Sequence, residues 1–342
     1  MTSDDSRRRS RGSTSRWPAS IDEPSHTCNP ASESSTRGWG SWNYDQTMPA
    51  KILGLHHVTA ITADAKANHD FYVNTLGLRL VKQTVNFDDP TSLHLYYGDE
   101  TGSPGSIVTF FVHTGLPRGV VGAGEVGELF YEVPDHAKLR DNVTWAELPD
   151  PDGLRVRVVT GNPETDEQRL RLSQVVAYLP SVGFDASAAF LEKHLGFTDA
   201  NPNVARIERV HLSLSANDYA APVRLEANTG RHRPGAGTIH HIAFRIATED
   251  EQLALREELV AAGVNVSPVM DRQYFKSIYF REPGGILLEV ATDGPGFAVD
   301  EDASTLGTKL CLPPQFEAHR EQLEQVVPWI RPAQQAQSAA ES

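Results

Sequence analysis

The sequence predicts an α+β fold built from four repeated strand-helix-strand modules. Two similar strands begin with paired histidines, two similar helices end at a glycine, and two tight turns lead into apolar strands. These repeated segments are residues 55–59 and 239–243, residues 71–78 and 190–197, and residues 150–158 and 282–290. Self-similarity of this kind indicates one supersecondary unit that is copied along the chain.

The repeats divide the chain into modules at roughly residues 51–114, 125–160, 172–229 and 237–293. In the first and third modules, an amphipathic pattern that stops at Gly77 or Gly196 predicts a helix with a glycine just after its end. The helix of the second module is expected around Asp135 to Asn142. A stretch rich in Pro and Gly, residues 228–237, links the third module to the fourth.

We expect two domains from these modules. Residues 51–160 form the N-terminal domain with the first two modules, and residues 172–293 form the C-terminal domain with the last two. Residues 296–342 are expected to contain an amphipathic helix and a polar tail. That helix would run from Pro314 to Ile330, with these apolar residues on one side: Phe316, Leu323, Val326 and Ile330.

Residues 1–48 differ from the rest of the chain. They contain Arg7-Arg8-Arg9, many serines and no apolar periodicity, which predicts a disordered N-terminal extension. The segment lacks the apolar region of a secretory signal, and its acidic residues argue against an organelle transit peptide. A third hypothesis is that the native chain starts at Met48, directly before the first strand.

Composition restricts the class of protein. A length of 342 residues suggests about two domains. The net charge of −14 disfavours nucleic acid and anionic membranes as partners. There is no run of 18 apolar residues that would predict a transmembrane helix. Cys28 and Cys311 lie in dissimilar contexts, which argues against a disulfide framework and favours a reducing cytoplasm.

Strand alternation selects three polar residues as candidate metal ligands. Neighbouring side chains in a strand point to opposite faces. Because Ile242 and Leu288 belong to apolar faces, His241 and Glu289 point the other way, and alternation also separates His57 from the apolar face of its strand. Two imidazoles and one carboxylate are the facial triad that binds non-haem Fe(II) and leaves open positions. A buried carboxylate also requires a cation or hydrogen bonds.

Two further features concern the same strands. His56 and His240, the first members of the two pairs, are candidates for a supporting role at the strand mouths. Arg157 occupies the place of Glu289 in the second module. Because an arginine does not ligate a cation, we expect no metal role for that copy.

Several motifs resemble the vicinal oxygen chelate superfamily, which includes glyoxalase, bleomycin-resistance proteins and extradiol dioxygenases. They are most similar to its ring-cleaving dioxygenases that act on hydroquinones. The motifs are residues 55–59, 77–87, 94–99, 103–105, 271–280 and 296–301, within a resemblance that covers about residues 51 to 330. The resemblance implies βαβββ modules that form two paired, cup-shaped mixed sheets, with the metal shared by the first and last modules.

Carried over position by position, the resemblance implies a pocket lined by His56, Thr59, His240, Arg272 and Tyr279. The two histidines and the tyrosine would handle protons, the arginine would stabilise anionic charge, and the threonine would orient substrate or O₂. The residues themselves leave simpler roles open. Arg272 could form a surface ion pair with Asp271 or Glu282, and Tyr279 could fill the core.

The resemblance implies a dioxygenase that uses Fe(II), with Mn(II) as the alternative metal. It would open hydroquinone-type rings, substituted or halogenated, with both atoms of O₂. The expected partners are a small aromatic substrate, O₂ and further copies of the chain. Two alternatives stay open. A glyoxalase-like isomerase or lyase would need another carboxylate-type ligand, which residues 106–111 do not offer. A metal-free resistance protein would bind an aromatic compound without reaction.

Overall fold

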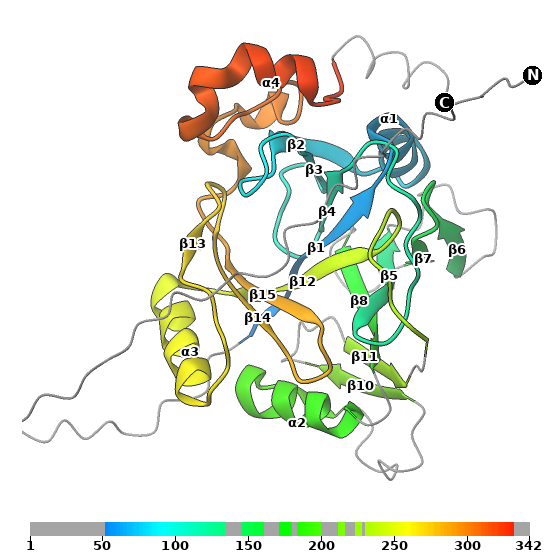
Figure 1. Ribbon diagram of the computed structural model, residues 1–342, viewed down its shortest axis with the longest axis vertical. Coiled ribbons are helices and arrows are strands. Elements are labelled where there is room, and N and C mark those ends of the chain that lie inside the picture. Colours follow the sequence, from blue (N-terminus) through cyan, green and yellow to red (C-terminus); the bar gives the residue numbers. More distant parts are fainter. Residues whose placement is uncertain are drawn as a thin grey trace, which may run out of the picture. The chain divides into compact units, whose positions relative to one another are not determined.

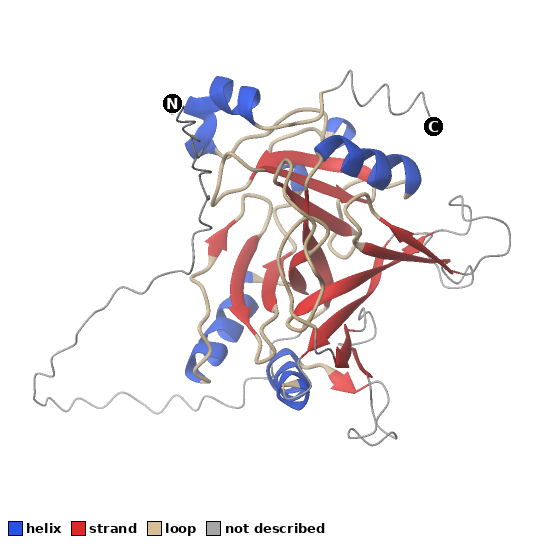
Figure 2. Ribbon diagram, turned by 45° about the vertical axis from the view of Figure 1, so that its right-hand side comes forward, coloured by secondary structure: helices blue, strands red, loops and turns tan. Residues whose placement is uncertain are grey.

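The computed structural model of the chain describes residues 52–133, 145–160, 171–179, 183–199, 211–215, 223–227 and 230–331. These residues form strands gathered into two sheets, with the helices at their outer sides (Figures 1 and 2). The α+β class predicted from the sequence is therefore confirmed. The expected extension of residues 1–48 and the expected helix around Asp135 to Asn142 lie outside the described residues.

The elements follow the predicted module order. The first module contains β1 (Gly54–Thr62), α1 (Ala65–His69) with a π-helical turn (Asp70–Thr75), β2 (Arg79–Val85), β3 (Leu93–Gly98) and β4 (Ile107–Val112). The second contains β5 (Glu125–Val133), β6 (Trp145–Pro149) and β7 (Arg155–Thr160). The third contains β8 (Arg171–Leu179), α2 (Phe184–Leu195), β9 (Thr198–Asp199), β10 (His211–Ser215) and β11 (Val223–Ala227). The fourth contains β12 (Ile239–Ile246), α3 (Glu249–Ala261), β13 (Met270–Asp271), β14 (Lys276–Arg281) and β15 (Leu287–Thr292).

Strand pairing joins the modules across the sequence. The first and fourth modules form an eight-stranded sheet in the order β13-β14-β15-β12-β1-β4-β3-β2. The second and third modules form a seven-stranded sheet in the order β6-β7-β5-β8-β11-β10-β9. The expected pair of mixed sheets is present. Because the sheets group the modules as outer and inner pairs, the domain division at residues 51–160 and 172–293 follows chain order alone and stays a prediction.

The predicted helix ends and apolar faces have clear local causes. Gly77 (φ 78°) and Gly196 (φ 70°) both adopt the left-handed conformation that ends a helix and that glycine adopts without strain. At the start of α3, Thr248 and Glu251 form a reciprocal capping box. Leu255 of α3 belongs to the same buried cluster as the apolar residues on one face of β12. That face of the sheet is therefore covered, and the polar face remains for the site.

The C-terminal segment differs from the single helix expected there. Residues Pro314–His319 form a 3₁₀-helix, and α4 spans Arg320–Val326. Leu323 is buried, but Val326 is 63% exposed, so its predicted place on the apolar side is wrong. Ile330 is buried beyond the end of the helix. Pro314–His319 has the tighter winding of a 3₁₀-helix, which breaks the periodicity on which that prediction rested.

Two polar side chains of β2 fix this segment to the eight-stranded sheet. The Gln83 amide donates to Gly307 O (3.0 Å) and Ile330 O (2.9 Å). Lys82 is fully buried, and its ammonium donates to Asp300 Oδ1 (2.6 Å) and to the Glu301 carboxylate. A buried ammonium requires such counter-charges. In Figure 1, α4 accordingly lies beside β2.

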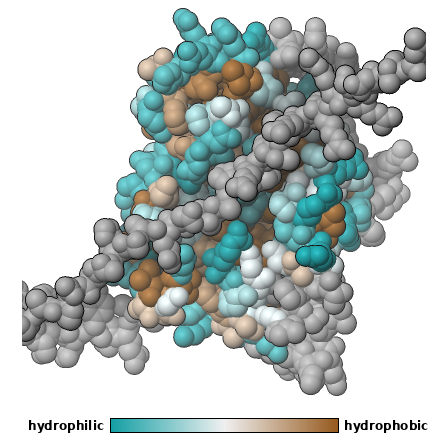
Figure 3. Space-filling model, in the orientation of Figure 1, coloured by the Kyte–Doolittle hydropathy of each residue, from teal (hydrophilic) through white to brown (hydrophobic). Residues whose placement is uncertain are grey.

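The described residues contain no helix that is long and apolar enough to cross a membrane. On the face shown in Figure 3, hydrophilic residues surround smaller groups of hydrophobic residues. Scattered exposed apolar side chains of this kind are normal for a protein surface.

The buried Lys82 pair gives a prediction for stability. We expect Lys82→Met to lower the free energy of unfolding by about 3–5 kcal/mol, because the Glu301 carboxylate stays buried without its cation. Urea denaturation followed by circular dichroism measures the change. Lys66→Met removes an exposed ion pair with Asp70 and should change stability by less than about 1 kcal/mol. Equal losses in the two variants would contradict this account.

Candidate metal centre

The structure brings the three predicted ligands together on one face of the eight-stranded sheet. His57 Nε2 lies 3.3 Å from Glu289 Oε2, and His241 Nε2 lies 2.8 Å from the same oxygen. The two Nε2 atoms are 3.4 Å apart. All three residues are buried, with exposed fractions of 2% for His57, 5% for His241 and 0% for Glu289. The cluster therefore presents two nitrogens and one oxygen to a common point.

A β-bulge in each of the two central strands accounts for the histidine pairs. The Cα pairing of β1 with β12 runs Leu55↔Phe244, His57↔Ala243, Thr59↔His241 and Ala60↔Ile239. His56 and His240 are thus the extra residues, which the pairing skips. A bulge interrupts strict alternation and re-aims side chains. Both members of a pair can therefore lie at the site, which alternation alone did not predict.

The first histidine pair forms a hydrogen-bond chain with a fixed direction. His56 Nε2 lies 3.1 Å from Thr292 O, and His56 Nδ1 lies 2.9 Å from His57 Nδ1. Burial lowers the pKa of His56 to about 3, so its ring is neutral near pH 7. Because the Thr292 carbonyl can only accept, Nε2 of His56 carries the hydrogen and Nδ1 accepts from His57. When His57 is neutral, as a metal ligand must be, its Nε2 then presents a lone pair to the cluster.

The second pair repeats this contact. His240 Nδ1 lies 2.8 Å from His241 Nδ1, and the rings meet edge to face. His240 is more exposed than His56. A hydrogen bond to the distal ring nitrogen orients a ligand histidine and fixes its tautomer, as in many metal sites. Both first members therefore contact a candidate ligand, and their supporting role stays a prediction.

The electrostatics of Glu289 fit a bound cation. Its Oε1 accepts a hydrogen bond from Ser277, but among the described residues no donor has hydrogen-bonding geometry toward its buried Oε2. Burial alone would raise the pKa of this carboxyl, yet His57 and His241 hold it well below its usual range. An ionised oxygen that faces two imidazole nitrogens without a hydrogen bond is costly unless a cation lies between them. The residues thus fit a divalent transition metal with nitrogen and oxygen ligands.

A threonine occupies the position related to Glu289 by the repeat. Thr109 of β4 pairs with Thr59 of β1. Glu289 of β15 pairs in the same parallel manner with Ala243 of β12. Thr59 and Ala243 are equivalent in the repeat, because each lies two residues after a candidate ligand histidine. Thr109 is therefore the counterpart of Glu289. The fourth side of the cluster therefore offers a hydroxyl and no second carboxylate.

The strands of the seven-stranded sheet pair in the same registers as those around the ligand cluster, but other residues occupy the ligand positions. The positions that match the three ligands hold Gln174, Glu128 and Arg157. Arg157 Nε lies 2.8 Å from Glu128 Oε2. A guanidinium thus supplies the positive charge that faces the carboxylate in this sheet.

Arg272 and Tyr279 lie together beside the cluster. The Arg272 Nε donates to Tyr279 Oη (3.1 Å), and its Nη2 donates to Asp88 Oδ2 (3.1 Å). Arg272 thus forms its ion pair with Asp88 of the first module, and the described residues show no pair with Asp271 or Glu282. The Tyr279 ring meets the His241 ring edge to face, with centroids 5.8 Å apart. Burial raises the pKa of Tyr279, so its hydroxyl keeps its proton.

Thr59 and several residues not selected from the sequence complete the surroundings. Thr59 Oγ1 accepts a hydrogen bond from Thr109 Oγ1 (2.8 Å). Phe275 packs against the rings of His56 and His57. The residues missed at this site are Ser277, Phe275, Asp88, Thr109, His94 and Tyr96. A polar residue within an apolar strand, such as Thr109 in β4, is the one signal that could have identified part of this set.

A second acidic cluster needs no metal. Asp300, Glu301 and Cys311 bring their ligand atoms close together. Lys82 contacts all three, with its ammonium 3.7 Å from the Cys311 sulfur. The lysine therefore already supplies the positive charge of this cluster.

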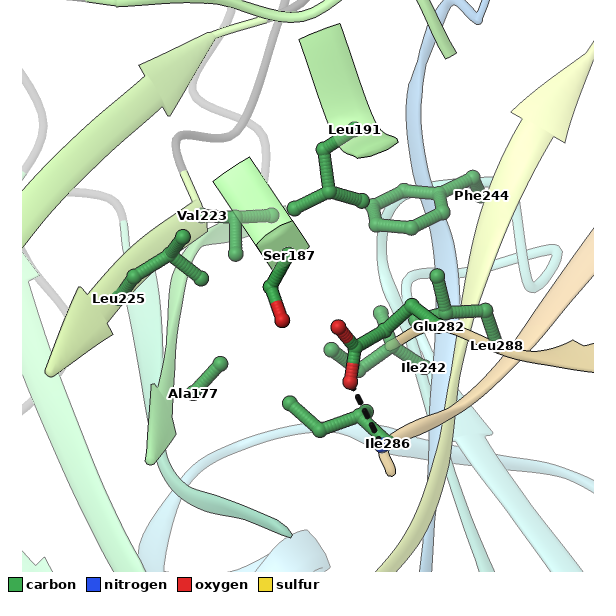
Figure 4. A pocket seen from close by; sticks show the side chains of 10 residues that line it. All are labelled: Ala177, Ser187, Leu191, Val223, Leu225, Ile242, Phe244, Glu282, Ile286 and Leu288. Carbon is green, nitrogen blue, oxygen red and sulfur yellow. Dashed lines mark hydrogen bonds between the residues drawn. The ribbon is translucent and has the colours of Figure 1, made fainter. Parts of the chain in front are cut away.

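A small pocket lies on the opposite face of β12 and β15 (Figure 4). Ile242 and Leu288 line it, and each alternates with a ligand of the cluster on the other face. Its polar groups are Ser187 and Glu282, and the Glu282 carboxylate accepts from Ile286 N (2.8 Å). We assign this pocket to the packing between α2 and the sheets.

Sequence comparison identifies relatives over most of the chain. The family model of the Glyoxalase/Bleomycin resistance protein/Dioxygenase superfamily matches residues 54–153 and 172–290. The "Putative ring-cleaving dioxygenase MhqO" of Bacillus subtilis (strain 168) is 41% identical over 302 residues, which cover 81% of this chain and 96% of the relative. The chlorohydroquinone/hydroquinone 1,2-dioxygenase of Sphingobium indicum is 28% identical over 310 residues, with coverage of 81% and 96%.

Solved structures agree with these matches. The crystal structure of a "putative dioxygenase" from Bacillus subtilis has a TM-score of 0.72 and 38% identity, and the match covers 81% of this chain and 97% of that chain. Glyoxalase I from Zea mays has a TM-score of 0.51 and 16% identity, with coverage of 70% and 92%. The second likeness shows the fold alone.

Substitution of the carboxylate tests the ligand set. We expect Glu289→Gln to abolish tight metal binding while the fold stays intact, because a neutral amide removes the charge that holds the cation. Metal analysis after anaerobic Fe(II) loading and desalting measures the stoichiometry, and circular dichroism reports the fold. The exposed Glu249→Gln variant should retain the wild-type stoichiometry. Full iron content in Glu289→Gln would show that the assignment is wrong.

Substitution of His56 tests the hydrogen-bond chain. We expect His56→Phe to weaken metal affinity by about 10–100-fold, because His57 Nδ1 loses the acceptor that fixes its tautomer. Competition with a chelator measures the affinity. His194→Phe removes another buried histidine, which bonds Glu258 on α3, and should leave metal affinity unchanged. An unchanged metal affinity in His56→Phe would refute the role of the hydrogen bonds that His56 makes.

Proposed function

This chain belongs to the Glyoxalase/Bleomycin resistance protein/Dioxygenase superfamily, and from this premise we propose that it is a non-haem Fe(II)-dependent ring-cleaving dioxygenase. We propose hydroquinone-type aromatic rings, including substituted or halogenated ones, as its substrates. The observation that carries the proposal is the buried cluster of His57, His241 and Glu289, in which the repeat-related fourth position holds Thr109. Relatives named as ring-cleaving dioxygenases cover most of the chain and support the activity.

The identity of the fourth position favours an oxygenase over an isomerase. A glyoxalase-like isomerase would need another carboxylate-type ligand from the first module. Thr109 lies at the position related to Glu289, and its hydroxyl donates to Thr59 instead. A three-residue ligand set leaves open positions for both an aromatic oxygen and O₂, as the facial triad does.

The metal would supply redox chemistry that the side chains lack. When bound, Fe(II), or Mn(II) as the alternative, supplies a redox-active centre at which an aromatic ring and triplet O₂ can react. His57, His241 and Glu289 would hold it. The His56–Thr292 and His240 contacts would keep the two imidazoles in the tautomer that leaves Nε2 free.

The surrounding side chains would bind and orient the substrate. Arg272 is positively charged, contacts Tyr279 Oη and lies next to the cluster, so it could stabilise an anionic oxygen of the substrate. His240 is exposed on one side, so it could pass a proton to solvent. The protonated Tyr279 hydroxyl could donate a hydrogen bond beside His241. Phe275 packs over His56 and His57 and would exclude water from them.

We also propose a cytoplasmic enzyme that needs no organic cofactor and forms a homo-oligomer. Its partners would be a small aromatic substrate and O₂. The acidic net charge of −14 supports the absence of nucleic acid from this set.

Oxygen uptake tests the proposed activity. We expect the chain, loaded anaerobically with Fe(II), to consume equimolar O₂ and hydroquinone, because the ring-opened product takes up both oxygen atoms. An oxygen electrode measures uptake, and mass spectrometry after reaction in isotopically labelled O₂ counts the incorporated atoms. Chelator treatment should abolish uptake, and reloading with Fe(II) or Mn(II) should identify the metal that restores it.

Each alternative function predicts a different result. An isomerase would convert a glutathione hemithioacetal without consuming O₂. A metal-free binding protein would bind hydroquinone equally well before and after chelation. No O₂ uptake with a panel of hydroquinones and catechols would refute the oxygenase proposal.

A further inference from the structure

His94 belongs to the motif of residues 94–99, to which the proposed function assigns no role. It lies on β3 and is buried together with three other polar groups of the eight-stranded sheet. Tyr96 Oη lies 3.0 Å from His94 Nδ1, and His94 Nε2 lies 2.8 Å from Thr109 Oγ1. Thr109 Oγ1 lies 2.8 Å from Thr59 Oγ1. Four buried polar side chains thus form one continuous chain that ends two residues from His57.

The hydrogen bonds of this series all run in one direction. Thr109 donates its hydroxyl hydrogen to Thr59, so it must accept from His94 Nε2. Burial holds the pKa of His94 well below its usual range, so the ring is neutral. Its Nδ1 is then an acceptor, and Tyr96 is the donor. Every hydrogen bond therefore points from Tyr96 toward Thr59.

The hydroxyl hydrogen of Thr59 is the free end of this chain. Thr59 Oγ1 accepts from Thr109. Among the described residues, none accepts a hydrogen bond from the Thr59 hydroxyl. Cα pairing places Thr59 opposite His241, on the face that carries the ligand cluster. The Thr59 hydroxyl, the donor left available by this series of hydrogen bonds, thus lies on the face where the substrate would bind.

The repeat gives His94 a counterpart with a known contact. Ser277 of β14 donates to Glu289, one of the candidate metal ligands. Ser277 pairs with Ala291, two positions after Glu289. His94 pairs with Phe111, two positions after Thr109. His94 therefore supports Thr109 from the position at which Ser277 supports Glu289.

Aromatic contacts restrict the orientation of the His94 ring. The ring centroid lies 4.1 Å from that of Tyr96 and 4.4 Å from that of Phe111. Phe111 in turn meets the His240 ring edge to face, with centroids 5.4 Å apart. A ring held on two sides keeps its two nitrogens aligned with Tyr96 and Thr109, which preorganises the chain.

We propose that His94 is a positioning residue that, acting through Thr109, holds the Thr59 hydroxyl as a hydrogen-bond donor to the aromatic substrate beside His57. The inference rests on the proposed function for the identity of the substrate. A fixed donor costs no reorganisation when the substrate binds. The position that would supply a second carboxylate in an isomerase, as the fourth ligand, thereby serves substrate recognition in this protein.

A double-mutant cycle tests the proposal. His94→Phe keeps a ring and removes both nitrogens, and we expect kcat/KM for hydroquinone to fall about tenfold, the value of one hydrogen bond. Thr59→Val should cause at least the same loss. Because His94 acts through Thr59, the double variant should lose no more than Thr59→Val alone. Losses that multiply would overturn the proposal.

Three further measurements separate positioning from a general effect on the fold. Iron stoichiometry should be unchanged in His94→Phe, whereas anaerobic binding of hydroquinone to the Fe(II)-loaded variant should weaken by the same factor as kcat/KM. His94→Gln, whose amide can donate to Thr109, should recover part of the loss. Tyr97→Phe is the matched control and should keep the wild-type kcat/KM, because the buried hydroxyl of Tyr97, next to Tyr96 on β3, has no hydrogen-bond partner among the described residues.

The tautomer of His94 gives a readout without turnover. Nitrogen NMR of the labelled metal-free protein should show a neutral ring with the hydrogen on Nε2. A charged ring, or a hydrogen on Nδ1, would overturn the proposal. If the wild type consumes no O₂, the proposed function fails and the substrate part of this inference fails with it. If the wild type is active but the losses multiply, the role of His94 alone fails.

Discussion

Antiparallel pairing of β1 with β12 is the contact on which the candidate metal centre depends. These strands lie 184 residues apart at His57 and His241, and their pairing places the two imidazoles on one face. One bulge in each strand lets both members of each histidine pair reach the site. Parallel pairing of β12 with β15 then adds Glu289. A shift of one residue in either register would move a ligand to the apolar face.

Buried carboxylates impose a second constraint, and three of those in the described residues meet it differently. Glu301 faces the ammonium of Lys82, and Glu128 faces the guanidinium of Arg157. Glu289 faces two imidazole nitrogens and leaves one oxygen without a hydrogen bond. The first two carboxylates have a cation within the chain, whereas the third fits a cation from solution. This contrast within a repeated fold distinguishes the metal centre from its copy.

The fold was largely predictable because local signals mark its elements. Gly77 and Gly196 end their helices as the sequence indicated, and the module bounds agree with the strands. The C-terminal segment was less predictable. Val326 fits a helical apolar stripe, but the 3₁₀ winding of residues 314–319 and the attachment of Ile330 to Gln83 place it in solvent. A local sequence pattern does not predict such effects of contacts between distant residues.

The sequence by itself determined the α+β class, the fourfold repeat and the ligand types, because periodicity and residue chemistry are local properties. It also favoured His57, His241 and Glu289, since alternation separates polar from apolar faces within each strand. The tertiary structure decided which modules share a sheet, where the bulges fall, and which polar groups stand behind the ligands. The chain from Tyr96 through His94 and Thr109 to Thr59 crosses three strands, so it exists only once their registers are set.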